Sequence, residues 1–102
     1  MIDRNEIRKL IDGHTPEFTE RHFYQEAAEF ALAVSKLEMC EPTERWEARK
    51  RKSELLVEIV DMTIMLEIAK ERYGISDVEF RLEVRNKMAQ NLKRVKNGKS
   101  KE

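Results

Sequence analysis

The chain has 102 residues, and its 20 Lys and Arg residues balance its 20 Asp and Glu residues, giving a formal net charge of zero. A chain of this length forms one domain at most, with a core too thin to enclose a deep pocket within one subunit. The balanced charge argues against general attraction to nucleic acid or to anionic membranes. Because Cys40 is the only cysteine and we expect neither a signal peptide nor a membrane span, we expect a cytoplasmic protein.

Helix-forming residues dominate the sequence, and three glycines and two prolines mark its joints, so we expect an all-α protein. A short first helix is expected over about residues 4–11, closed by Asp12-Gly13. Thr15 as N-cap and Pro16 at the first helical position begin a second helix, which ends near Met39. The predicted fold is an antiparallel helical bundle of one short and three main helices, completed by oligomerisation.

The third helix is expected within residues 44–73, although its strongly charged first part, residues 44–54, fits either a solvated helix or a loop. Gly74-Ile75 fits a glycine C-cap followed by a hydrophobic residue. The capping-box pattern Ser76-Asp77-Val78-Glu79 then begins a fourth helix.

The fourth helix is expected to end by about Lys96. Its broad apolar face is made by Val78, Phe80, Leu82, Val84, Met88, Leu92 and Val95. We therefore expect a single domain over residues 1–96 and a polar, frayed tail over residues 97–102.

Two short acidic motifs, Glu26-Ala-Ala-Glu29 and Glu58-Ile-Val-Asp61, lie within the most apolar helical stretches. Residues three apart lie on nearly the same helix face, so two antiparallel helices could focus all four carboxylates on one point. Buried neighbouring carboxylates need positive charge or protons, and oxygen ligands suit Mg²⁺, with Mn²⁺ as a substitute. The alternatives are solvated acidic faces and buried ion pairs, for example with Lys36 or Arg85.

The ordered motifs resemble those of the MazG-type all-α nucleoside triphosphate pyrophosphohydrolases. That superfamily includes dimeric dUTP pyrophosphatases and phosphoribosyl-ATP pyrophosphohydrolase. The resemblance covers roughly residues 14–95 and rests on the two acidic motifs, the Gly-Ile-Ser joint and a Lys87-x-x-x-Asn91-x-x-Arg94 ending. It implies that all four acids bind the metal and that Lys87, Asn91 and Arg94 contact phosphates.

The reaction implied by the resemblance is cleavage between the α and β phosphates, giving a nucleoside monophosphate and pyrophosphate in nucleotide-pool cleansing. Mg²⁺ held by the acids would neutralise developing charge and lower the pKa of the attacking water, with Glu29 the preferred general base. His14-Thr-Pro16 resembles an H-x-P element whose histidine approaches the base, the alternative being a polar turn histidine. The family often has an acid where this chain has Gln25, which puts the rate in doubt.

One thin helical subunit cannot wrap a nucleotide, so we expect a homodimer or homotetramer that binds a nucleotide substrate but neither nucleic acid nor membrane. The other functions considered are a non-catalytic helical interaction module, an inactive paralogue of this family, and a phosphoribosyl-ATP pyrophosphohydrolase-like activity. A di-iron bundle protein is disfavoured, because no histidine follows an acid of either motif by three residues. Several aromatic residues could stack on a base, namely Phe18, His22, Tyr24 and Trp46. Such residues more often belong to a core or an interface.

Overall fold

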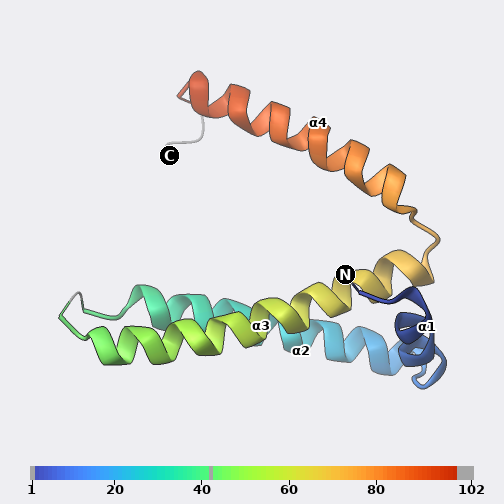
Figure 1. Cartoon of the computed structure of the whole chain (residues 1–102), viewed down its shortest axis with the longest axis horizontal. Helices are drawn as coiled ribbons and strands as arrows, with labels where there is room; N and C mark the ends of the chain where they lie inside the picture. The colour runs from blue at the N-terminus through green and yellow to red at the C-terminus, as the bar shows by residue number, and fades with distance from the viewer. Residues whose placement is uncertain (1, 42, 99–102) are drawn as a thin grey trace. The chain divides into compact units, whose positions relative to one another are not determined.

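The structure is a computed structural model that describes residues 2–41 and 43–98. Within these residues the chain forms four α-helices and no strand: α1 (Arg4–Asp12), α2 (Pro16–Glu38), α3 (Arg45–Arg72) and α4 (Asp77–Lys96) (Figure 1). The chain is therefore all-α, as predicted. None of the helices in the described part combines the length and the apolar character needed to cross a membrane.

Two of the predicted helix starts are made by the predicted caps. At the start of α2, the Thr15 hydroxyl accepts a hydrogen bond from the backbone N–H of Phe18 at 3.1 Å, and Pro16 occupies the first helical turn. At the start of α4, Ser76 and Glu79 form a complete capping box. Each cap satisfies backbone N–H groups that lack a partner within the helix, so these boundaries follow from local sequence.

The charged segment of residues 45–54 is helical and continuous with the rest of α3. Arg51 lies 2.9 Å from Glu47, four residues before it, and 3.1 Å from Glu54, three residues after it. Such pairs on one helix face stabilise an exposed helix by a few tenths of a kcal/mol each, about 0.2–0.5. The open choice between a solvated helix and a loop is thus decided in favour of a helix.

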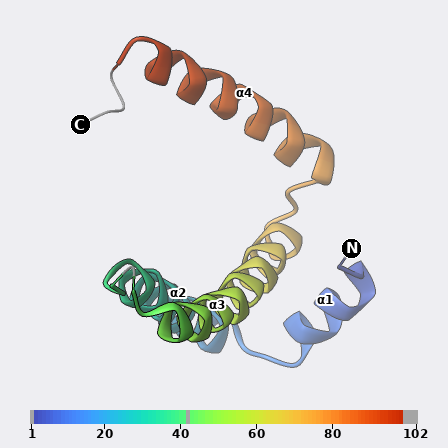
Figure 2. The ribbon, with the colours of Figure 1, turned by 60° about the vertical axis from the view of Figure 1, so that its left-hand side comes forward.

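The chain divides into two compact units, Met1–Arg72 and Tyr73–Glu102. In the first unit, α2 and α3 run antiparallel side by side, and α1 packs against α3 (Figures 1 and 2). The core of this unit consists of Ile7, Met65 and Ile68, with Ile2, Ile11, Phe23 and Ile64 packed against it.

Polar contacts flank the place where α1 covers α3. Arg4 forms an ion pair with Glu67, and Arg8 Nε donates to Glu71 Oε1 at 2.7 Å. Exposed ion pairs contribute about 0–1 kcal/mol each, whereas full burial of one isoleucine contributes about 1.5–3 kcal/mol. Because Ile7 is only 1% exposed, apolar contact is the main force that holds α1 on α3.

The second unit, taken by itself, consists of α4 with its flanking residues. Gly74 has a φ of 68°, in the left-handed region that favours glycine, as expected for a residue that ends α3. All of the apolar residues predicted to form one face of α4 are more than 40% exposed, from Val84 at 43% to Val78 at 65%. The single domain over residues 1–96 stays a prediction, and within the predicted tail residues 99–102 lie outside the described residues.

Candidate metal centre

The predicted metal ligands of the first unit lie on the two antiparallel helices. Glu26 and Glu29 belong to α2, and Glu58 and Asp61 belong to α3. One carboxylate oxygen from each of Glu26, Glu58 and Asp61 lies within 4.8 Å of the other two. Helix pairing thus brings carboxylates from both motifs close together, where they could share a cation.

Glu29 is half-buried but does not belong to this group of three acids within the described residues. Its Oε1 accepts a hydrogen bond from Gln25 Nε2 at 3.2 Å. Its negative charge nevertheless helps to raise the pKa of Glu58. Glu29 therefore borders the group and interacts with it electrostatically.

Two of the clustered acids have a buried oxygen that nothing in the described residues satisfies. Glu26 is only 8% exposed, and its Oε1 lies 3.0 Å from His22 Nε2, but its Oε2 is buried without a hydrogen-bond partner. Glu58 Oε2 is likewise buried without a partner. An unsatisfied buried acceptor costs about 1–3 kcal/mol, and more when it is charged. These two oxygens could therefore serve as ligand atoms for a hard divalent cation.

The pKa of Glu58 is raised above its ordinary value, first by burial and then by the negative charges of Glu29, Asp61 and Glu26. All of these causes act in the same direction, because each disfavours the ionised form of Glu58. A bound cation would oppose every one of them. The alternative of buried ion pairs does not account for the two unpartnered oxygens, and Lys36 is an exposed residue near the end of α2.

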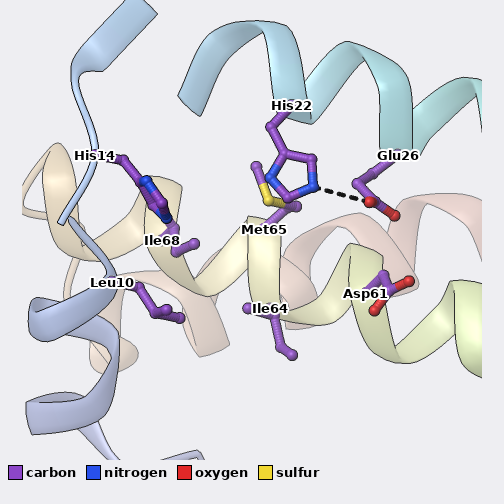
Figure 3. A pocket seen from close by; sticks show the side chains of 8 residues that line it. All are labelled: Leu10, His14, His22, Glu26, Asp61, Ile64, Met65 and Ile68. Atoms are coloured by element: carbon purple, nitrogen blue, oxygen red, sulfur yellow. Dashed lines mark hydrogen bonds and ion pairs between the residues drawn. The ribbon is translucent and has the colours of Figure 1, made fainter. Parts of the chain in front are cut away.

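A cavity of about 250 Å³ adjoins the acids within the first unit (Figure 3). It is lined by Leu10, His14, His22, Glu26, Asp61, Ile64, Met65 and Ile68. Figure 3 shows Glu26 and Asp61 together at one end and His14 with Leu10 at the other. The site thus combines an acidic end, which suits a cation, with a largely apolar interior, which suits an apolar group.

Aromatic rings form a row beside this cavity. The rings of His14 and Phe18 stack with centroids 4.5 Å apart and an interplanar angle of 22°. The Phe18 ring is tilted by 58° against that of His22, at 5.8 Å. His14, which was predicted to approach a base, therefore lines the cavity as part of an ordered set of rings.

The hydrogen bond of His22 to Glu26 was not predicted from the sequence. His22 was considered only as an aromatic residue that could stack on a base. The spacing of four residues between the two side chains was a usable indication, because residues four apart are neighbours on a helix surface.

The residues predicted to contact phosphates belong to the second unit. Lys87, Asn91 and Arg94 are exposed on α4. Their separations of four and three residues place them along one face of that helix. Their contact with a triphosphate stays a prediction.

Comparisons of this chain with models of known protein families, with curated protein sequences and with solved structures found no match. The clustered acids, the unpartnered oxygens and the adjoining cavity together define a candidate divalent-metal centre with room for an organic ligand.

Proposed function

We propose that this chain is a Mg²⁺-dependent nucleoside triphosphate pyrophosphohydrolase of the MazG type, with Mn²⁺ as a substitute metal. It would cleave between the α and β phosphates and thereby remove unwanted nucleotides from the cytoplasmic pool. The observation that carries this proposal is the pair of buried, unpartnered oxygens, Glu26 Oε2 and Glu58 Oε2, in an acidic group completed by Asp61. The order of the acidic and basic motifs along the chain supports the same family.

The acids have separate roles in this proposal. Glu26, Glu58 and Asp61 hold the cation, and Glu29 borders it as a further ligand and as the general base. Mg²⁺ would supply positive charge beside the phosphate oxygens and lower the pKa of the attacking water. Gln25 orients Glu29 through their hydrogen bond but adds no negative charge, so we expect a slower reaction than in relatives with an acid at this position.

The substrate would extend from the acids into the cavity. Its phosphates lie at the acidic end, and its nucleoside part enters the space beside His14, where the apolar side chains favour an uncharged ring. By the resemblance to the family, Lys87, Asn91 and Arg94 of α4 would contact the phosphates, since Lys and Arg donate charge-assisted hydrogen bonds to phosphate oxygens. Phosphoribosyl-ATP has the same triphosphate chemistry and is the alternative substrate.

We further propose that the chain acts as a homodimer or homotetramer. On α3, Leu56, Val57 and Val60 are 61%, 56% and 48% exposed. Contiguous exposed apolar surface is typical of protein interfaces, and a second copy would cover it. The same surface favours a non-catalytic interaction module as the second candidate function, for which no metal-dependent turnover is expected.

The test is a panel of standard and modified NTPs and dNTPs, together with phosphoribosyl-ATP, incubated with Mg²⁺, Mn²⁺ or EDTA. Pyrophosphate release and nucleoside monophosphate formation are followed together, because only cleavage between the α and β phosphates gives both. We expect metal-dependent turnover of at least one substrate. Glu29→Gln and Asp61→Asn should each abolish it while circular dichroism shows an intact fold.

The matched control is Glu20→Gln, which removes an exposed carboxylate from the same helix, α2, and should retain turnover. Absence of turnover across the whole panel would contradict the enzymatic proposal. Unaltered turnover in both Glu29→Gln and Asp61→Asn would contradict the assignment of the acids.

A further inference from the structure

His22 contacts the most buried acid of the cluster. Its Nε2 lies 3.0 Å from Glu26 Oε1, while the other oxygen of the same carboxylate, Oε2, is buried without a partner. An ionised carboxylate oxygen can only accept a hydrogen bond, so with an ionised Glu26 the donor of this contact is Nε2. The contact therefore occupies one oxygen of Glu26 and leaves the other for a cation.

The His22 ring, whose side chain is 43% exposed, contacts Phe18 as well as Glu26. Phe18 packs against this ring at a centroid distance of 5.8 Å, and the His14 ring stacks on Phe18. Phe18, His22 and Glu26 follow one another at intervals of four residues along one face of α2, and the His14 ring, just before this helix, stacks on Phe18. Figure 3 shows the His22 ring above Met65 and directed at Glu26.

An ordinary ion pair between residues four apart on a helix surface contributes little, about 0.3–0.5 kcal/mol. The pair of His22 and Glu26 differs from that case, because the Glu26 side chain is only 11% exposed and ends in an unsatisfied oxygen. Removing the His22 hydrogen bond would leave both oxygens of this buried carboxylate without a partner. The hydrogen bond therefore determines which way Glu26 presents its free oxygen.

We propose that His22 is a positioning residue of the metal centre, which orients Glu26 so that Oε2 faces the cation. This inference rests on the metal centre of the proposed function, and it goes beyond it by assigning a role to a residue outside the acidic motifs. Hydrogen-bond partners of metal ligands typically contribute 10- to 100-fold to metal affinity. Because His22 also lines the cavity, the same ring connects the cation with whatever occupies the cavity.

The experiment measures Mn²⁺ binding to the full chain without nucleotide, by electron paramagnetic resonance of free Mn²⁺. His22→Leu removes the donor and should weaken binding about 10- to 100-fold. His22→Gln places an amide N–H close to the position of Nε2 and should recover most of the affinity. His22→Asn is also polar, but its amide lies near the position of Nδ1, so it should bind as weakly as His22→Leu.

The matched control is Glu20→Gln, an exposed change on the same helix as His22, which should leave Mn²⁺ affinity unchanged. Thermal unfolding in EDTA, followed by circular dichroism, compares the folding of all variants. Equal affinity of His22→Leu and the wild type would overturn the role of His22. Equal losses in His22→Gln and His22→Leu, or a matching loss in Glu20→Gln, would also overturn it.

The outcomes also separate this role from the proposed reaction. A wild-type protein that binds no Mn²⁺ overturns the metal centre and the role of His22 together. A wild-type protein that binds Mn²⁺ in a His22-dependent way but turns over no substrate overturns the hydrolytic function alone.

Discussion

The substitution Glu26→Gln tests the energetic description of the acidic cluster most directly. Glu26 is 8% exposed, holds His22 through one oxygen and buries the other without a partner, close to the carboxylates of Glu58 and Asp61. Glutamine keeps the size of the side chain and removes its charge. Its amide can also donate a hydrogen bond towards a neighbouring carboxylate oxygen, which the native carboxylate cannot do.

The size of the effect follows from the buried oxygen. An unsatisfied buried acceptor costs about 1–3 kcal/mol, so Glu26→Gln should stabilise the metal-free protein by about that amount. Because 1 kcal/mol shifts the melting temperature of a domain of about 60–100 residues by roughly 4–8 °C, several degrees of increase are expected. With Mn²⁺ at a hundred times its dissociation constant, the wild type should gain about 2.7 kcal/mol, whereas the variant has lost a ligand and should gain little.

The assay is urea unfolding of both proteins, once in EDTA and once in excess Mn²⁺. We expect the variant to be the more stable protein in EDTA and to lose that advantage when metal is added. Glu20→Gln is the control: this exposed change on the same helix should alter stability by less than about 0.5 kcal/mol and keep the full metal-dependent gain. A variant that is less stable than the wild type in EDTA, or that gains as much from Mn²⁺, would refute the reasoning.

Two further predictions concern pH and assembly. Because the pKa of Glu58 is raised in the folded, metal-free protein, the folded chain protonates Glu58 at a higher pH than the unfolded chain does. Protonation of Glu58 therefore increases the free energy of unfolding as the pH falls through the raised pKa. Urea midpoints in EDTA between pH 7 and about pH 4 should therefore rise relative to those of Glu58→Gln, and an unchanged difference would contradict this. The double substitution Leu56→Lys/Val60→Lys should reduce the mass in solution, measured by light scattering, to the 12.1 kDa of one chain, and a wild type already of that mass would contradict self-association.

Helix boundaries were predictable because they depend on contacts within a few residues. Thr15 and Ser76 cap their helices through backbone groups three positions away, and no tertiary contact is needed. The helical state of residues 45–54 was also encoded locally, in the spacing of Glu47, Arg51 and Glu54. The high charge of residues 45–54 also fitted a loop, although the spacing of these three residues already indicated a helix.

The meeting of the two acidic motifs was predictable from helix periodicity, but the choice between Glu26 and Glu29 within the first motif was not. Residues three apart on an α-helix differ by about 60° around its axis, since each residue turns by about 100°. On α2 that difference separates Glu26, which joins the cluster, from Glu29, which borders it and is held by Gln25. Periodicity places residues on a face, whereas side-chain torsions and local hydrogen bonds determine which oxygen reaches a shared point.

The position of the acids relative to the core links folding to binding. Asp61 lies one turn before Met65 and two turns before Ile68 on α3, and these two residues both form the core and line the cavity. A ligand in the cavity therefore covers the edge of the surface that holds the first unit together. In the proposed function, a metal at the acidic end would relieve the repulsion between the carboxylates, and an apolar ring at the other end would extend the core, so both would act on the same folding equilibrium. A small, thin core next to four acids is thus the arrangement expected when the bound ligand supplies part of the stability of the folded state.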